Sequence, residues 1–587
     1  MAKPDLVDPV LGDIAARLRA ALAAAGLPDA DPELEKPKQA DHGDWASTLA
    51  LRLAKPVGRP PRELAEAIVA HLEVPEEVAD VSVAGPGFVN LRLSHRYHEG
   101  LVRRVVADGA RFGRRERPAP ERETVNVEFV SANPTGPLHV GAGRWAATGD
   151  AIAALLEADG HTVVREYYVN DAGEQVRRFG ESVALVGRGE PVTEDHYQGA
   201  YIGEIAEQLR AAHGAELFTA VPEVEVELGG GSVDHDGGPV GQLVEDAAAP
   251  ASDPRVDPRI AARVGVLAVE VMRRRIEAQL HQLGVDFDVW FSERTLHETG
   301  AIEATVGELA AAGHTYEADG AVFLRTTAHG DDKDRVLVRS DGRPTYFAAD
   351  CAYMRDKWSR AGRLYYLLGA DHHGYIVRLK AAASCLGVPP DQVEIRIGQF
   401  VNLLRGGAPV RMSKRAGEAV DLDEVVTEVG ADVTRYHFLR QGLDTTIDFD
   451  LAEVAAQSME NPVYYVQYAH ARINSLIRTA DERGFDHGTI DDADLTRLEH
   501  PAELELLTTM ARLPLVVAEA AELRATQRLA RYAEELAGTF HRFYTECRVL
   551  VEGDEPLGRA RYWLAVAAKQ VLANALALLR VRAPERM

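Results

Sequence analysis

The stretch from Glu128 to Asp150 restricts the fold of this chain more than any other part of its sequence, and it reads EFVSANPTGPLHVGAGRWAATGD. Residues 124–130 are apolar and β-branched, which predicts a buried strand, and residues 144–159 have the spacing and composition of a helix. A turn rich in proline and glycine separates them. Such a turn before a helix presents unpaired N–H groups and the positive end of the helix dipole. The sequence therefore predicts a site for a nucleotide phosphate in this turn.

The segments after this turn indicate the class of fold. Residues 161–169 are strand-like again, so strand, helix and strand follow one another at the spacing of a βαβ unit. From Asn461 onward, apolar residues recur at intervals of three and four, which predicts a helical bundle. The expected fold class is α/β plus all-α, with a Rossmann-type, doubly wound parallel nucleotide-binding domain that carries an insertion. A small α+β N-terminal domain precedes it, and an α-helical bundle forms the C-terminal part.

Changes of pattern along the 587 residues predict the domain boundaries. Glycine, proline and acidic residues dominate positions 215–257, which favours a long insertion without a packed element there. The predicted parts are residues 1–118 for the N-terminal domain, 119–390 for the Rossmann-type domain with its insertion at about 180–335, 391–455 for a connecting segment with a second loop, and 456–587 for the helical domain.

Composition argues against several classes of protein. No window approaches the ~18 continuous apolar residues that span a bilayer, and the first residues are too polar and acidic for a signal peptide, so we expect a cytoplasmic protein without a membrane partner. Cys351, Cys385 and Cys547 lie far apart without a C-x-x-C pair, so neither a disulfide framework nor a cysteine zinc site is expected. The net charge of −26 disfavours non-specific binding to nucleic acid, so a nucleic-acid partner would need local basic faces.

Two short motifs resemble the signatures of the class I aminoacyl-tRNA synthetases. The first is H-V-G-A at residues 139–142, within the string SANPTGPLHVG, which resembles the bacterial arginyl-tRNA synthetases in particular. It departs from the signature at Ala142, where the second histidine is expected. The second is V-R-M-S-K-R-A-G at residues 410–417, which resembles K-M-S-K-S and keeps its central lysine, Lys414. The resemblance implies ATP-dependent attachment of L-arginine to arginine tRNA, with Lys414 as the mobile cation that stabilises the departing pyrophosphate.

Candidate residues for arginine and ATP follow from these motifs. Tyr346 and Asp350 stand four residues apart on a predicted helix, so a phenol and a carboxylate share one face and suit a planar guanidinium. An exposed pair or a helix cap is the alternative for these two. The resemblance implies that His139 and Lys414 are catalytic, that Glu128, Ser131, Asn133, Tyr346 and Asp350 bind arginine, and that Pro134, Gly136, His139, Gly141, Asp371, His372, Met412, Ser413 and Lys414 bind ATP. A metal site at Asp371 and His372 is disfavoured, because adjacent histidines on a turn cannot easily face one ion.

The partners expected from the resemblance are arginine tRNA, L-arginine and ATP. Residues 1–118 resemble the N-terminal domain that touches the corner of the tRNA in this family, and the C-terminal part resembles its anticodon-binding bundle. Tyr464, Tyr468 and Met587 are candidates for tRNA contact, with core packing as the alternative for the aromatic residues. Mg²⁺ is expected with ATP as its counter-ion. No zinc and no metal held by protein side chains are expected, and the chain is expected to be a monomer.

Two other functions stay open from the sequence. Another class I synthetase is one, although a cysteine-specific enzyme would call for a zinc-binding cysteine set, and Glu128 and Asp350 suit a cationic substrate. A tRNA-binding relative without catalysis is the other, suggested by Ala142 and by the arginines at positions 411 and 415. Charging assays on tRNA transcripts distinguish these possibilities.

Overall fold

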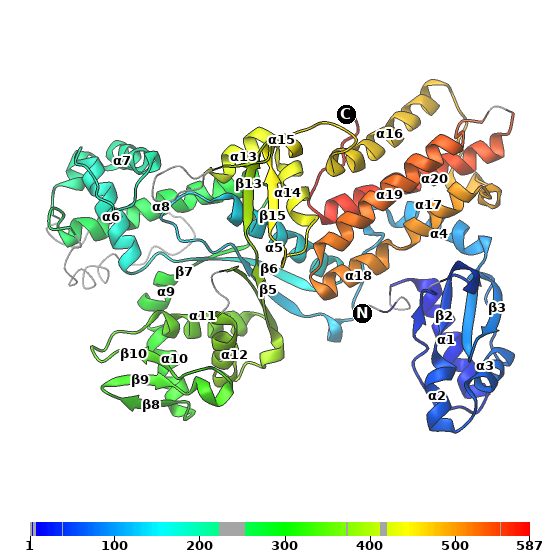
Figure 1. Cartoon of the computed structure of the whole chain (residues 1–587), viewed down its shortest axis with the longest axis horizontal. Helices are drawn as coiled ribbons and strands as arrows, with labels where there is room; N and C mark the ends of the chain where they lie inside the picture. The colour runs from blue at the N-terminus through cyan, green and yellow to red at the C-terminus, as the bar shows by residue number, and fades with distance from the viewer. Residues whose placement is uncertain are drawn as a thin grey trace. The chain divides into compact units, whose positions relative to one another are not determined.

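The computed structural model describes residues 3, 7–37, 39–221, 253–370, 374–410, 420–551 and 553–587. The chain forms two compact units (Figure 1). The first unit comprises residues 1–118, 154–160 and 457–587, and the second comprises residues 119–153 and 161–456. No helix among the described residues is long and apolar enough to cross a membrane.

The second unit is built on a parallel sheet of five strands in the order β12-β11-β5-β6-β7. Its central strand, β5, is almost entirely buried, as a strand covered on both faces should be. The prediction of a Rossmann-type parallel sheet is therefore confirmed. The strands are β5 (Thr124–Phe129), β6 (Thr162–Val169), β7 (Val289–Ser292), β11 (Arg363–Gly369) and β12 (Val393–Gly398), connected in part by helices α5 (Val140–Ala158), α11 (Tyr346–Arg360) and α12 (Tyr375–Cys385).

Helix α5 lies close against β5 because position 149 is glycine. A Cβ atom there would lie 2.2 Å from the Phe129 side chain, so any larger residue would push the helix away. The next residue, Asp150, is buried and paired with Arg165 at 3.0 Å and Arg435 at 2.6 Å. The helix that follows the glycine-rich turn is thus fixed to the sheet by close packing and by two buried ion pairs.

The chain between β6 and α11 adds helices and a second small sheet. Strand β7 pairs with β6, so the parallel sheet extends into the range of about 180–335 that the sequence predicts as an insertion. This edge strand is only four residues long and half-buried, which makes it a weak sequence signal. Of the acidic stretch at 215–257, residues 222–252 lie outside the described part of the chain. The elements are α6 (Glu174–Gly187), α7 (Ala200–His213), α8 (Pro258–Gln282), α9 (Glu293–Glu298), α10 (Ala301–Ala311) and an antiparallel sheet of β8 (Thr315–Ala318), β9 (Ala321–Leu324) and β10 (Arg335–Val338).

A third sheet follows β12 and is tied to the first turn of α5. Its elements are β13 (Val401–Arg405), β14 (Ala408–Pro409) and β15 (Ile447–Asp450), with α13 (Leu422–Val429), α14 (Ala431–Leu439) and α15 (Leu451–Val454) beside them in the sequence. The tie is Arg144 of α5, a fully buried guanidinium that donates to the carbonyl oxygens of Gln399 at 3.0 Å and Gly442 at 2.8 Å. Burial lowers the pKa of Arg144 to about 10.

The first unit contains an α+β part and a helical bundle. Its sheet has the order β1-β2-β4-β3, and residues 81–93, whose sequence predicts strand, turn and strand, belong to the β3–β4 hairpin. The spacing of apolar residues predicts one helix from Leu504 to Leu523. In the structure this segment is divided at Arg512, because Pro514 cannot supply a helical N–H and so begins a new helix. The elements are α1 (Pro9–Ala24), β1 (Leu34–Glu35), β2 (Trp45–Ser47), α2 (Leu49–Val57), α3 (Pro61–Ala70), β3 (Val78–Ala84), β4 (Phe88–Leu93), α4 (His95–Asp108), α16 (Pro462–Glu482), α17 (Pro501–Ala511), α18 (Leu513–Leu523), α19 (Thr526–Glu546) and α20 (Glu555–Leu578).

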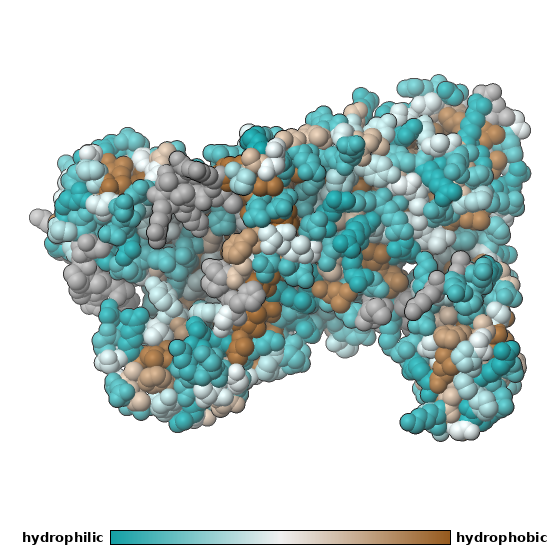
Figure 2. Space-filling model, viewed as in Figure 1, coloured by the Kyte–Doolittle hydropathy of each residue, from teal (hydrophilic) through white to brown (hydrophobic). Residues whose placement is uncertain are grey.

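The face shown in Figure 2 is mostly hydrophilic, and apolar residues gather on it in small separate groups. Charged residues make up 27% of the sequence, with an acidic excess. Scattered apolar residues on such a surface are ordinary and mark no site. A ligand site is expected instead at the carboxyl edge of the parallel sheet, where ligands bind in folds of this class.

Candidate active site

The chain leaves β5 through two residues with left-handed backbone. Val130 has φ 69° and Ser131 has φ 39°, a conformation that costs a residue with a side chain on the order of 1–3 kcal/mol. The bend places the Ser131 hydroxyl where it donates to Glu128 Oε1 at 3.0 Å and accepts from the Tyr168 N–H at 3.1 Å. Glu128 and Ser131, both predicted to bind arginine, are therefore neighbours at the carboxyl end of β5.

His139 lies directly before the first turn of α5. The Ala142 N–H donates to the His139 carbonyl oxygen at 2.9 Å and to its Nδ1 at 3.2 Å; the second contact favours a neutral ring that carries its proton on Nε2. Gly141 leaves room for the ring, since a Cβ atom there would lie 3.0 Å from the imidazole. Ala142, at the position of the second signature histidine, is buried. The turn therefore holds one imidazole in a defined tautomer at a helix N-terminus.

The chain that follows the second signature returns to this turn. Asp421 pairs with His139 in an antiparallel bridge, and the Leu422 N–H donates to the Leu138 carbonyl oxygen at 2.8 Å. The Leu422 side chain is fully buried against Gly143, where a Cβ atom would lie 2.4 Å from it. Residues 420–422 are thus fixed against the first signature, while residues 411–419 lie outside the described part of the chain.

Carboxylates gather around Tyr168 and the start of α11. Burial, together with the charges of Glu293 and Glu128, raises the pKa of Asp350 to about 7. A 2.5 Å hydrogen bond that the Tyr375 hydroxyl donates to Asp350 opposes this rise. Burial, Glu293, Asp350 and Glu128 likewise raise the pKa of Tyr168 far above its usual value. Such a concentration of negative charge favours binding of a cation.

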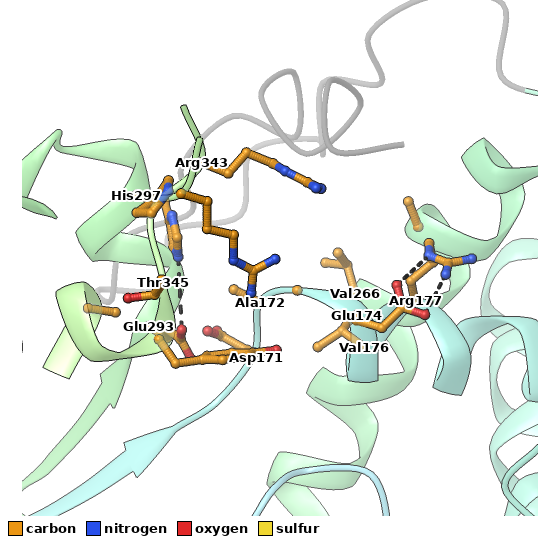
Figure 3. Close-up of a pocket in the computed structure, with 16 residues that line it drawn as sticks. Asp171, Ala172, Glu174, Val176, Arg177, Val266, Glu293, His297, Arg343 and Thr345 are labelled. Carbon is orange, nitrogen blue, oxygen red and sulfur yellow. Dashed lines mark hydrogen bonds and ion pairs between the residues drawn. The ribbon is translucent and has the colours of Figure 1, made fainter. Parts of the chain in front are cut away.

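A cavity of about 270 Å³ opens beside these carboxylates (Figure 3). Its lining includes Glu293, Asp171 and the exposed Tyr346 at the start of α11. Figure 3 shows the carboxylates of Glu293 and Asp171 near one another along one wall and the Arg343 side chain above them. Asp350, one helical turn after Tyr346, is not part of this lining. The cavity therefore has acidic, phenolic and basic groups around a space large enough for an amino acid.

A buried lysine compensates the charge of the Glu128 carboxylate. The Lys357 Nζ donates to Glu128 Oε2 at 2.6 Å, and the Lys357 side chain is fully buried, with its ammonium 3.7 Å from the centre of the Tyr366 ring. This pair compensates the Glu128 carboxylate inside the protein. Among the described residues, the carboxyl groups of this group without a buried lysine partner are therefore Glu293, which lines the cavity, and Asp350, which lies outside its lining.

Comparison with known proteins accounts for nearly the whole chain. Family models match it as the arginyl tRNA synthetase N terminal domain at residues 12–93, the catalytic domain of tRNA synthetases class I (R) at 104–198 and 268–476, and the DALR anticodon binding domain at 466–587. An arginine–tRNA ligase of Frankia alni is 46% identical over 583 residues, which cover 97% of this chain and 99% of that protein. The chain belongs to the arginyl-tRNA synthetases.

Solved structures agree with this membership. A Campylobacter jejuni protein, provisionally described as an arginyl-tRNA synthetase, is 32% identical with a TM-score of 0.71, covering 84% of this chain and 100% of that one. The arginyl-tRNA synthetase of Thermus thermophilus is 24% identical with a TM-score of 0.72, covering 98% of this chain and 100% of that one. At that identity, the second comparison supports the shared fold alone.

Other predicted residues of this synthetase lie around the first signature turn. Asn133 is exposed, and its Nδ2 donates to Gln175 Oε1 at 2.7 Å. Pro134 is buried, and Gly136 lies close to the hydroxyl of Tyr201, which a Cβ atom at position 136 would approach to 3.4 Å. The predicted ATP-binding residues Asp371, His372, Met412, Ser413 and Lys414 lie outside the described residues.

The residues predicted to contact tRNA lie on α16 and at the chain end of the first unit. The half-buried rings of Tyr464 and Tyr468 are nearly parallel, with centroids 6.2 Å apart. The C-terminal tail runs along the same helix, since His470 Nδ1 lies 2.8 Å from the Pro584 carbonyl oxygen. Met587 is exposed at the end of this tail. The aromatic pair is therefore only partly packed and keeps surface for a ligand.

Two residues of the acidic group do not follow from the sequence motifs. Glu293 begins α9, directly after β7, and is buried beside the cavity. Tyr375 begins α12 and holds Asp350 through its hydroxyl. The signal for Glu293 is its place at the carboxyl end of β7, which becomes visible only when β7 is assigned to the sheet. Tyr375 begins the helix that follows β11.

Proposed function

We propose that this synthetase joins L-arginine to arginine tRNA at the expense of ATP, giving arginyl-tRNA, AMP and diphosphate. Family membership over almost the whole chain supports the reaction, as does the 46% identity to the Frankia alni ligase. The structural observation that carries the proposal is the contact between the residues that follow the second signature and the first signature turn. It makes a shared triphosphate site possible.

The chain length supports such a site. Asp421 is bound to His139, and between Lys414 and Asp421 the chain has seven residue steps, which span at most about 25 Å when fully extended. Lys414 therefore lies within reach of a nucleotide bound at the N-terminus of α5. We assign the triphosphate to Pro134, Gly136, His139 and Gly141 on one side, and to Met412, Ser413 and Lys414 on the other, with Asp371 and His372 beside the adenosine.

The arginine side chain is assigned to the acidic group. We assign Glu293, which lines the cavity, and Asp350, one helical turn after Tyr346, to accept hydrogen bonds from the guanidinium, and the hydroxyl of the exposed Tyr346 to add a neutral contact. Ser131, Asn133 and the compensated Glu128 are assigned to the α-amino end of the substrate. A guanidinium is always charged, so it suits this environment better than any neutral side chain of similar size.

Activation forms a bond between a carboxylate oxygen of arginine and the α-phosphorus of ATP, and breaks the bond from that phosphorus to the departing pyrophosphate. Negative charge then grows on the pyrophosphate. The Nε2–H of His139, the first N–H groups of α5 and the Lys414 ammonium are assigned to stabilise it. Mg²⁺ enters as the counter-ion of ATP, and zinc takes no part in the reaction.

Transfer to tRNA completes the reaction. The 2′-hydroxyl of the terminal ribose attacks the carbonyl carbon of the adenylate, and AMP leaves. The family resemblance implies that tRNA must be bound before the adenylate forms. Residues 1–118 are assigned to the corner of the tRNA, residues 119–390 and 391–455 to catalysis, and residues 456–587, with Tyr464, Tyr468 and Met587, to the anticodon arm. We further propose that the chain works as a cytoplasmic monomer.

A charging assay tests the proposal. Purified protein, ATP, Mg²⁺ and transcripts of arginine tRNA and of unrelated tRNAs are incubated with each labelled amino acid in turn. Only arginine on arginine tRNA is expected to give a labelled product. Attachment of another amino acid would show that the proposed specificity for arginine is wrong. Binding of arginine tRNA without charging would instead identify a non-catalytic relative, the possibility that Ala142 raises.

A further inference from the structure

Three side chains that are distant in the sequence meet beside the small antiparallel sheet. They are His314 just before β8, His329 at the end of the short 3₁₀ helix Thr326–His329 after β9, and Cys385 at the end of α12. Ligand atoms of the two imidazoles and the thiol all lie within 4.8 Å of one another. The imidazole rings are 5.9 Å apart and inclined at 59°. Three different elements thus aim two nitrogens and a sulfur at one point.

Zinc is the ion that this set of ligands suits. Imidazole nitrogen and cysteine sulfur are the usual donors of tetrahedral zinc sites, whereas Mg²⁺ and Ca²⁺ take oxygen. In a formed site the donor atoms lie roughly 3.3–3.8 Å apart, given metal–ligand distances of about 2.0–2.3 Å. The longest separation in the observed group, at most 4.8 Å, exceeds that spacing by no more than about 1.5 Å.

The surroundings also favour a cation at this point. The Asp334 carboxylate lies near the Cys385 thiol. The Asp334 carboxylate is oriented by the N–H of Thr327 at 3.0 Å and by the Thr327 hydroxyl at 2.7 Å. This carboxylate adds negative charge near the three ligands, which favours a cation. Cys385 is buried and His329 is exposed, so the site has an inner wall and an entrance.

We propose that His314, His329 and Cys385 bind one Zn²⁺ ion, with water in the fourth position. The ion crosslinks the β8–β10 sheet to α12, the helix between β11 and β12 of the nucleotide-binding sheet. The proposal departs from the expectation of no zinc, which rested on cysteine spacing alone. It concerns stability of this region and is independent of the arginylation reaction.

The position of the site explains what the crosslink would stabilise. Cys385 belongs to a buried cluster that also contains Phe347 and Cys351, on the inner side of α11. The same helix carries Tyr346 and Asp350 at the candidate arginine site. Zinc at Cys385 would therefore hold the packing beneath α11, while its ligands stay out of the substrate cavity.

The full-length protein, purified from zinc-supplemented cells and dialysed against metal-free buffer, should retain about one zinc ion per chain by elemental analysis. Replacing zinc by Co²⁺ should give intense visible bands and a thiolate-to-cobalt band in the near ultraviolet, as tetrahedral cysteine ligation does. Removal of zinc with a chelator should lower the thermal midpoint, and added zinc should restore it.

Matched variants separate this site from adventitious binding. His329→Gln changes an exposed residue and should abolish zinc retention without unfolding the chain, and Cys385→Ala should abolish the thiolate band. Cys351→Ala removes a buried thiol of the same cluster, and His281→Gln removes an exposed imidazole elsewhere; both should keep zinc and the band. The proposal is overturned if the wild-type protein retains no zinc and shows no thiolate band with Co²⁺. It is equally overturned if His329→Gln binds zinc as the wild-type protein does.

Discussion

Replacing Asp350 by asparagine should weaken arginine binding without weakening the fold. The amide keeps the size of the carboxyl group but removes the charge that pairs with the guanidinium. A hydrogen bond to a charged group contributes about 1.5–3 kcal/mol, and 1.4 kcal/mol is a factor of ten. The Kd for arginine, measured by titration calorimetry, should therefore rise about 10- to 150-fold in Asp350→Asn.

The pH dependence of binding gives a second, independent signature. Burial and the neighbouring carboxylates raise the pKa of Asp350 to about 7, and the guanidinium binds the ionised form. Below this pKa, binding must first remove a proton, so the wild-type Kd should rise by up to about tenfold for each unit of pH below 7. Above it, the Kd should level off. Asp350→Asn has no proton to lose at this position, so its Kd should change little with pH.

Stability should move in the opposite direction to affinity. Because the folded pKa of Asp350 lies above its unfolded value, the folded state holds the proton more tightly, and this contribution to stability is lost as pH rises through about 7. Asparagine is neutral at every pH, so the thermal midpoint of Asp350→Asn at pH 7.5 should be no lower than that of the wild type.

A control on the same helix completes this test. Asp356→Asn removes a half-exposed carboxylate that pairs with Arg360, and it should leave the arginine Kd unchanged. A change of less than about threefold in Asp350→Asn would refute the assignment of the guanidinium to Asp350. A wild-type Kd that is flat between pH 5.5 and 8.5 would refute the reasoning from its pKa.

Three further substitutions test other parts of the site. Lys414→Ala should slow arginine-dependent pyrophosphate exchange, measured with arginine tRNA present, about 10²- to 10³-fold and leave the arginine Kd unchanged; a large loss of arginine affinity would contradict its role. Glu293→Gln should raise the arginine Kd at least about tenfold, whereas the Glu303→Gln control on α10 should leave it unchanged. Equal effects of the two substitutions would show that Glu293 does not bind arginine. Gly143→Ala should slow the exchange reaction, because its Cβ would meet Leu422 at 2.4 Å. Adding Leu422→Val should partly restore the rate. A double variant no faster than Gly143→Ala would show that the contact between these two residues does not position the second signature loop.

The sequence predicts those parts of the fold whose pattern lies within neighbouring residues. The strand at 124–130, the glycine-rich turn and the helix after it have strong patterns over neighbouring residues, and they correspond to β5 and α5. The division between α17 and α18 depends on a single proline and was missed. Residues 285–291 have the composition of a strand, but the sequence does not show that β7 belongs to the sheet, because its pairing with β6 joins residues that are more than 100 positions apart.

The site was accessible only in part for the same reason. The resemblance supplied the pair Tyr346 and Asp350, and the structure places an acidic group around Asp350. No local sequence pattern indicates that Lys357 compensates the charge of Glu128, since the two residues are 229 positions apart. Glu293 was missed because a lone glutamate after a short strand has no motif. Charge pairing of this kind follows from tertiary packing, which the order of residues does not display.

The substitution at Ala142 is easier to understand once the turn is seen. The backbone N–H at this position donates to His139 Nδ1 at 3.2 Å, and a backbone group makes that contact whatever the side chain is. The orientation and tautomer of His139 therefore do not depend on a second imidazole. In the proposed active site, the side chain at position 142 supplies no donor to the phosphates, and the proposed donors are the Nε2–H of His139, the N–H groups of α5 and the Lys414 ammonium. Because donors of this kind act together on one developing charge, we expect the absence of one donor to place more of the stabilisation on Lys414.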